Sequence, residues 1–571
     1  MFYIKYWKFQ PSLTAEQVLR LFDKRETMQL ASYREEEERL MLGIVVVAGR
    51  HLARNVKALA WMTDILPKTL VPDQRSHHSS TYFTQPPIYC RENYTPHKLE
   101  ILAFMQNLHL TTTAHTLVNS DEKAKYIRDF ERIKRPISKE TDVDKIDREE
   151  AEERLEDFLR SKGSEMIITV DHQGYSNLRT ARRLGRAAAT ALEKFRYCAY
   201  FRMGGFHTKL NKVSLDTKRS LCGLDINSVD VGSLGHLNGL FNLKLVVEDK
   251  KIRSGGQFEV QDQGLTCVGF SYLTSAMEAY LTEVLKGKIG VNKDLDGATK
   301  IILGCLNNFK ILVTFKAAEV EKASVDDADD LRKTGRLLAA QALVSEVGDY
   351  FESTGDAMGL RGLNISLISY FLGRKKIKAD AKYAAALLSE LLQYQAASPR
   401  VRQRLDNTAV AWSSSAPDSG IFRDMKQEVE VKKVQQLEKR SQGPIRHVYI
   451  EEQVKCFAKD LKLHYSLQIR ALCVTSQILE HDRASMLTPK RRSRSYDYIG
   501  EEKRARLQKY VCSLQAFSTL RECPVTFSFV SVPSSIFANC TPELESRFLS
   551  NQATLYKEQT VGLVRCEQPI K

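Results

Sequence analysis

Three neighbouring stretches of the chain carry apolar residues at the three-to-four spacing that places them on one face of a helix. The predicted helices lie at 329–352, 360–371 and 379–396. The third is rich in Ala and Leu, which indicates tight packing against its neighbours. Helical patterns dominate from Tyr272 onward, and no repeat with a period of roughly 20–50 residues is visible. A large part of the chain is therefore predicted to be a helical domain.

The pattern changes at Met166, where a short run of β-branched residues begins. Such a run between polar residues predicts a short, buried strand. The predicted elements of this region are a strand at 167–170, a helix at 179–194, a strand at 197–202 and a strand at 243–248. Strands that alternate with a helix and a glycine turn predict an α/β region within the chain.

The chain has 571 residues, more than one hydrophobic core usually organises. Helices are also predicted at 33–66 and 98–110, and the alternating charges of 120–160 predict a solvent-exposed helix with i,i+4 ion pairs. Residues 523–531 alternate like a strand. We expect a mixed, predominantly α-helical fold with an embedded α/β region. The predicted regions are a helical N-terminal region with a charged linker helix at 1–160, an α/β region at 161–260, a helical domain at 261–485, and a basic linker with a C-terminal segment at 486–571.

Basic residues exceed acidic ones, with 85 Lys and Arg against 70 Asp and Glu, a formal net charge of +15. This excess favours polyanionic partners such as DNA or RNA, although a solvated basic surface is the simpler alternative. Two basic groups are candidate nucleic-acid contacts. They are a helical stripe of Arg179, Arg182 and Arg183, and a compact cluster of Lys490, Arg491 and Arg492. The second group also fits a nuclear-localisation signal.

Eleven cysteines are scattered singly and none forms a C-x-x-C pair, which suits a reducing compartment. No apolar run approaches the roughly 18 residues that a membrane span needs. We therefore expect an intracellular protein, with a nuclear location favoured by its basic cluster and no membrane association.

Asp171 is the first candidate for a catalytic or metal-binding role because it follows a predicted strand, where many α/β enzymes place an acid. The alternative is that Asp171 caps a helix beginning near Ser176. Asp424 and Glu428 are one helical turn apart, so both can face one site, or both can belong to a solvated charged face. His207, beside a glycine turn, is either a metal ligand or a structural histidine.

Several strings of residues resemble a single family when taken in order. They are Val170-Asp171-His172-Gln173 with arginines behind it, Gly204-Gly205-Phe206-His207, the stretch 355–400 ending in Ser398-Pro399-Arg400, and Asp424 with Glu428. On these residues the chain resembles a transposon-associated family of fungi and invertebrates that carries a domain of unknown function. The resemblance covers roughly residues 30–440.

The resemblance implies an RNase H-like transposase ancestry. Enzymes of that class use two or three carboxylates to hold Mg²⁺ ions that activate a nucleophile at a phosphate. On this basis Asp171, Asp424 and Glu428 are the candidate catalytic acids, and Asp171 and His207 the candidate metal ligands. The chain departs from the family at Gly205, where the family has an aspartate before Phe-His. That departure implies an incomplete set of metal ligands.

Three hypotheses follow: a transposon-derived protein with a degenerate site and nucleic-acid affinity, an active Mg²⁺-dependent nuclease or transposase, and a basic helical scaffold without a site. An active site requires Asp171, His207, Asp424 and Glu428 to converge within about 5–8 Å.

Overall fold

The fold was analysed in a computed structural model of the chain. The residues it describes are 31–70, 95–135, 141–162, 166–170, 172–184, 188, 190–193, 195, 197, 200–220, 230–246, 252, 257–311, 329–372, 377–396, 399–412, 419–424, 498–521, 523–528 and 548.

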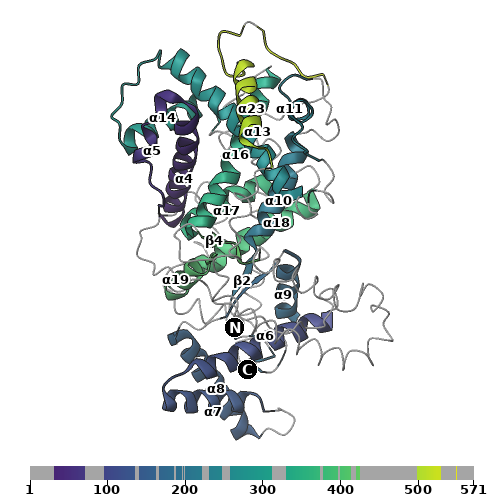
Figure 1. The fold of residues 1–571 in the computed structure, drawn as a ribbon. Coiled ribbons are helices and arrows are strands. Elements are labelled where there is room, and N and C mark those ends of the chain that lie inside the picture. Colours follow the sequence, from purple (N-terminus) through teal and green to yellow (C-terminus); the bar gives the residue numbers. More distant parts are fainter. Residues whose placement is uncertain are drawn as a thin grey trace, which may run out of the picture.

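Long helices form the upper part of the molecule, which we call the helical body (Figure 1). At its centre, α13 (Gln257–Ala279) packs along α16 (Asp330–Thr354), and α4 (Ala31–Asn55) packs on both α16 and α17 (Ala357–Leu372). α18 (Ile377–Ala396) packs on α17. The helices predicted at 329–352, 360–371 and 379–396 are therefore confirmed as α16, α17 and α18. The fold is predominantly helical.

Local signals define the ends of α16. The Asp329 side chain accepts a hydrogen bond from the backbone N–H of Arg332, which caps the first turn. The helix ends at Gly355, whose φ of 62° is in the left-handed region that glycine adopts without strain.

Three helices lie at the lower end of the molecule, which we call the three-helix unit (Figure 1): α6 (Thr95–Thr116), α7 (Ser120–Ile133) and α8 (Asp142–Lys162). Ion pairs between Lys162 and Glu122 and between Arg132 and Asp147 show that α7 and α8 run antiparallel. The prediction of one solvent-exposed helix over 120–160 is wrong, because the two helices bury a shared apolar core. Its members are Leu110, Ala114, Tyr126, Phe130, Ile133, Ala151, Leu155, Leu159, Ala191 and Tyr197.

A pair of parallel strands lies between the three-helix unit and the helical body (Figure 1). β1 (Ile167–Val170) pairs with β2 (Tyr200–Met203), and Val170 is opposite Met203. The strand predicted at 167–170 is confirmed, and the second predicted strand is displaced toward Met203. The predicted helix at 179–194 is wrong in its bounds, since α9 runs over His172–Leu184. Residues 190–193 form a turn, in which Thr190 and Glu193 each accept the other's backbone N–H.

The strand predicted at 243–248 is wrong over its described residues, 243–246. Lys244 has a φ of 61°, which a strand does not tolerate. Side-chain amides accept hydrogen bonds from the backbone here instead. The Asn238 side chain accepts from the N–H of Leu245, and the Gln261 side chain accepts from the N–H of Val246. The strand predicted at 523–531 is likewise absent over 523–528, where the carboxylate of Asp330 accepts the N–H of Phe527.

The remaining described elements complete the fold. They are η1 (Lys57–Leu59), α5 (Met62–Ile65), α10 (Gly205–Ser220), α11 (Leu234–Phe241), η4 (Tyr280–Val284), α14 (Leu295–Asn308), α19 (Pro399–Asn407), β3 (Ala411–Trp412), β4 (Gly420–Ile421) and α23 (Glu501–Ser513). The helix predicted over 33–66 therefore ends at Asn55, and short helical turns follow it. Among the described helices, none is both long and apolar enough to cross a membrane.

His51 of α4 links this helix to α13. Its ring stacks on Phe270 with centroids 4.4 Å apart, and its Nε2 lies 3.0 Å from the Thr274 hydroxyl. Burial lowers the pKa of His51 to about 4, well below its ordinary value of 6.5. The folded state therefore favours the neutral ring.

We predict that His51 makes the protein less stable as pH falls from 6.5 to 4. The unfolded chain protonates His51 in this window and the folded chain does not, so the stabilisation present above pH 6.5 is lost toward pH 4. The expected loss by pH 4 is about 3 kcal/mol. Urea unfolding of His51→Phe, which keeps a ring on Phe270, should show a correspondingly flatter pH dependence. An unchanged pH dependence would contradict this assignment.

Candidate functional site

The junction between β2 and α10 is where the predicted site residues meet. The backbone N–H of Gly204 donates to the Val170 carbonyl at 2.7 Å, which extends the β1–β2 pairing by one bond. α10 begins at the next residue, Gly205, so Gly204 occupies the N-cap position. Helices leave their first N–H groups unpaired, and the N-cap side chain usually accepts one of them. Gly204 has no side chain to do so.

Asp424 supplies the missing cap from a distant part of the sequence. Its Oδ1 accepts the N–H of Phe206 at 3.1 Å, and its Oδ2 accepts the N–H of His207 at 3.0 Å. Asp424 follows β4 in the chain and its side chain is only 3% exposed. The negative carboxylate also lies at the positive end of the helix dipole of α10. The alternative that Asp424 belongs to a solvated charged face is therefore wrong.

Gly204 and Gly205 allow this close approach. A Cβ on Gly204 would lie 2.0 Å from Oδ2 of Asp424, and a Cβ on Gly205 would lie 2.4 Å from the ring of Phe422. Neither glycine has the positive φ that would require glycine on conformational grounds. Glycine is required at both positions because the segment before Asp424 packs directly on the β2–α10 turn and leaves no room for a Cβ.

His207 makes a second contact with the same carboxylate. Its Nδ1 lies 3.0 Å from Oδ2 of Asp424, and its side chain is 23% exposed. An ionised carboxylate can only accept hydrogen bonds, so Nδ1 carries a hydrogen and donates it. This fixes the orientation of the ring, as a carboxylate does for a histidine in many metal and catalytic sites. The geometry is a His–Asp pair at the end of β2.

Two lysines attach the next turns of α10 to the helical body. Lys209 Nζ lies 2.8 Å from Asp262 of α13 and 2.6 Å from Asp349 of α16. Burial alone would lower the pKa of Lys209, but these carboxylates outweigh it and raise the pKa above its ordinary value. One turn further, Lys212 Nζ lies 2.5 Å from Asp216 and donates to Ser345 at 2.9 Å. Lys209 thus remains charged, and both amines are paired with carboxylates.

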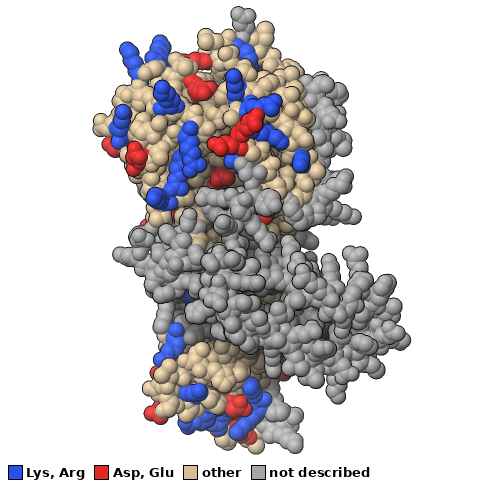
Figure 2. All heavy atoms as spheres, viewed as in Figure 1, with Lys and Arg blue, Asp and Glu red and all other residues tan. Residues whose placement is uncertain are grey.

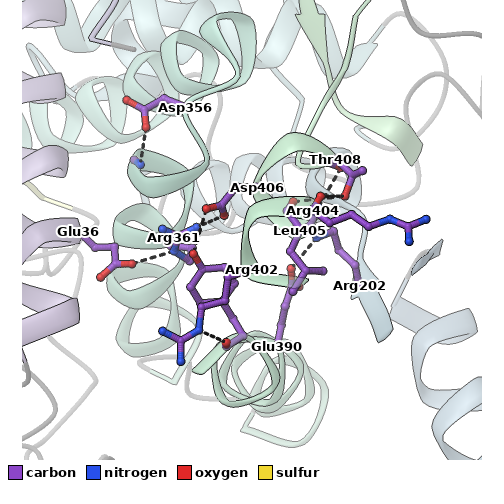
Figure 3. A network of polar contacts seen from close by, with 12 residues as sticks. Glu36, Arg202, Asp356, Arg361, Glu390, Arg402, Arg404, Leu405, Asp406 and Thr408 are labelled. Atoms are coloured by element: carbon purple, nitrogen blue, oxygen red, sulfur yellow. Dashed lines mark hydrogen bonds and ion pairs between the residues drawn. The ribbon is translucent and has the colours of Figure 1, made fainter. Parts of the chain in front are cut away.

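Figure 3 shows a second polar network on the other side of β2. Arg202 extends from β2 to Glu390 of α18, with its Nε 3.1 Å from the carboxylate, and donates to the backbone carbonyls of Leu405 and Thr408. Glu390 also accepts the N–H of Met203. Burial raises the pKa of Glu390, and the Arg202 guanidinium partly opposes this shift. β2 is therefore tied to α18 and to the end of α19.

Arg361 forms the centre of the same network (Figure 3). It extends from α17 between Glu36 of α4, 2.8 Å away, and Asp406 of α19. Its guanidinium lies 4.0 Å from the centre of the Tyr394 ring, and the Tyr394 hydroxyl donates to Asp406 at 3.0 Å. Arg361 thus joins four helices through charged and aromatic contacts.

A cavity of about 110 Å³ lies between these two networks. Its lining includes Arg202, Gly205, Lys209, Arg361 and Glu390, together with apolar residues of α17 and α18. Ligand pockets for small molecules usually measure roughly 300–1,000 Å³. The cavity is therefore too small for a nucleotide, and the charged groups described above already pair with protein partners.

The structure brings together two of the predicted site residues, His207 and Asp424. Asp171 follows Val170, whose carbonyl accepts the N–H of Gly204, but Asp171 itself lies outside the described residues. So do Glu428 and the basic cluster of Lys490, Arg491 and Arg492. Arg179, Arg182 and Arg183 belong to α9, and their side chains are not described. Among described residues, no three His, Cys, Asp or Glu side chains form a group able to hold a metal ion.

Sequence reasoning missed the residues that hold the junction in place. Lys212 is buried, and the side chains of Lys209 and Arg202 are only 16% and 14% exposed, although charged residues of a basic chain are usually exposed. Asp349, a partner of Lys209, is 140 positions away in the sequence, and Asp424, the partner of His207, is 217 positions away. The one local signal was Gly204-Gly205 ahead of a helix, which leaves an N-cap without a side chain.

The chain has no match among family models, curated proteins or solved structures.

We predict that Gly204→Ala destabilises the protein by about 2 kcal/mol, because the added methyl group displaces the Asp424 carboxylate. Asp424→Ala should cost about 1–2 kcal/mol through loss of the cap. Added to Asp424→Ala, the substitution Gly204→Ala should lower the free energy of unfolding by less than about 1 kcal/mol, since the clash is gone. Denaturant unfolding measures all three differences.

Gly290→Ala is the matched control for this cycle, since a Cβ there meets nothing within 4 Å. It should leave stability within about 0.5 kcal/mol of the wild type. Additive effects of Gly204→Ala and Asp424→Ala would show that the two residues do not interact as described.

Proposed function

We propose that the chain is a transposon-derived, nucleic-acid-binding protein whose RNase H-like acidic site has become a structural junction. The observation that carries this proposal is the Asp424 carboxylate at the N-terminus of α10. A carboxylate has about four acceptor positions, and three are directed at Phe206 N–H, His207 N–H and His207 Nδ1. A metal ion would have to displace these contacts.

Gly205, where the family has an aspartate, also supports the proposal that the acidic site is degenerate. In the family that the chain resembles, an aspartate precedes Phe-His, and it would project a second carboxylate at this turn. Here a Cβ on Gly205 would meet the Phe422 ring at 2.4 Å. The space that a metal-binding side chain needs is therefore filled by an aromatic ring, and Mg²⁺ binding would require this turn to move.

Nucleic-acid affinity is the second part of the proposal, and the net charge of +15 supports it. Figure 2 shows Lys and Arg side chains spread over the visible face of the helical body, with fewer Asp and Glu among them. Contacts from Arg179, Arg182, Arg183, Lys490, Arg491 and Arg492 belong to this proposal, as does a nuclear location through the last three residues.

An active Mg²⁺-dependent nuclease is the second candidate, and one observation favours it. The strand that precedes Asp171 in the sequence ends beside Gly204, the residue next to the His207–Asp424 turn. If Asp171 and Glu428 were added to this pair, the site would have the ligand types that Mg²⁺ prefers.

We predict that the wild-type protein does not cleave DNA or RNA in Mg²⁺ or Mn²⁺ above the level of Asp171→Ala and Asp424→Ala. It should bind a duplex with an affinity that falls steeply with salt, because binding releases counterions from phosphates. Cleavage that is lost in Asp171→Ala would establish the nuclease instead. Absence of both cleavage and salt-dependent binding would favour a scaffold without either activity.

A further inference from the structure

Basic charge is concentrated just before and within α23. Between positions 490 and 509 the chain has eight Lys and Arg and three Asp and Glu. These are Lys490, Arg491, Arg492, Arg494, Lys503, Arg504, Arg506 and Lys509, against Asp497, Glu501 and Glu502. A net charge of +5 in twenty residues is one third of the formal charge of the whole chain. This segment of the sequence is therefore much more basic than the chain as a whole.

The helix α23 has one buried face and one charged face. Leu507 and Val511 are buried against the helical body, while Arg506 and Lys509 are exposed. The helix has 13 residues, which corresponds to a length of about 20 Å. Its exposed side therefore offers cations over a length comparable to several phosphates of a nucleic-acid backbone.

Contacts at both ends hold α23 in a fixed position on α13 and α11. Before the helix, the backbone N–H of Tyr498 donates to Gln263 at 3.2 Å and the Tyr498 hydroxyl contacts Glu259 at 3.1 Å. Toward its end, the Tyr510 hydroxyl lies 3.0 Å from Nε2 of His236. A helix held in this way presents its cations without a further loss of backbone entropy on binding.

Two more exposed lysines lie at the same end of the helical body. Thr519, shortly after α23, donates its N–H to Glu283 at 2.8 Å and its hydroxyl at 2.7 Å. Glu283 belongs to η4, and the chain continues from η4 into the exposed residues Lys286 and Lys288. Lys286 and Lys288 thus follow Glu283, which Thr519 contacts just beyond the end of α23, and add exposed cations there.

We infer that this surface binds the phosphate backbone of a nucleic acid. We call it the α23 surface and define it by Arg506, Lys509, Lys286 and Lys288, all exposed. The inference rests on the proposed function and adds the location of the contact. Because the contacts are to phosphates and not to bases, binding has little sequence preference and depends strongly on salt.

The test compares two variants that remove the same charge from different surfaces. One combines Arg506→Gln, Lys509→Gln, Lys286→Gln and Lys288→Gln. The control combines Arg128→Gln, Lys125→Gln, Lys134→Gln and Lys145→Gln, all exposed on the three-helix unit. Both lose one Arg and three Lys, so the change in total charge is the same. Circular dichroism and thermal unfolding check that both variants keep the wild-type fold.

Binding is measured by fluorescence anisotropy across a salt series with a duplex DNA, a duplex RNA and a single-stranded DNA of equal length. The α23 variant should bind at least about tenfold more weakly than the wild type at low salt. The slope of log Kd against log salt should fall by about 3–4, since each phosphate contact contributes roughly 0.9. The control variant should stay within about threefold of the wild type.

The outcomes separate this inference from the proposed function. If the wild type binds and the α23 variant binds equally well, or if both variants lose affinity equally, the α23 surface is wrong while nucleic-acid binding stands. If the wild type binds none of the three probes, both proposals fall. The probe with the largest loss in the α23 variant identifies the form of nucleic acid that this surface binds.

Discussion

The Asp424 carboxylate at the start of α10 is the interaction on which the arrangement of the junction depends. It accepts two backbone N–H groups and the His207 ring, and it joins segments more than 200 positions apart in the chain. Gly204 provides no cap of its own and leaves space for this one. The parallel strands therefore meet the helical body at a turn that is stabilised by a carboxylate from elsewhere in the sequence.

Buried charges continue this pattern away from the turn. Lys209 and Lys212 attach α10 to α13 and α16, while Arg202 attaches β2 to α18. Each charge is fully or mostly withdrawn from solvent with a partner, and removing one partner of a buried pair is strongly destabilising. Asp424, which follows β4, thus has a structural role as the cap of α10. This is the physical basis for proposing a degenerate site and for placing the nucleic-acid contact on another surface, at α23.

The sequence predicted the elements whose structure depends on residues close together in the chain. The strand at 167–170 and the helices α16, α17 and α18 follow from β-branched runs and from apolar spacing. The strand predicted at 243–248 is absent over 243–246, because the side-chain amides of Asn238 and Gln261 accept the backbone N–H groups there. The burial of Asp424 was not visible in a charged sequence context, since its partner N–H groups belong to another part of the chain. Sequence reasoning named His207 and Asp424, but it did not predict their contact.

The most direct measurement of the central claim is amide exchange and Mn²⁺ broadening at Phe206 and His207, followed by NMR. If the Asp424 carboxylate holds both N–H groups, they should exchange slowly, at rates set by unfolding of α10. Millimolar Mn²⁺ should then leave both signals unbroadened, because the carboxylate remains on the helix. Fast exchange of both amides, or their selective broadening by Mn²⁺, would contradict the account and restore a metal site at this turn.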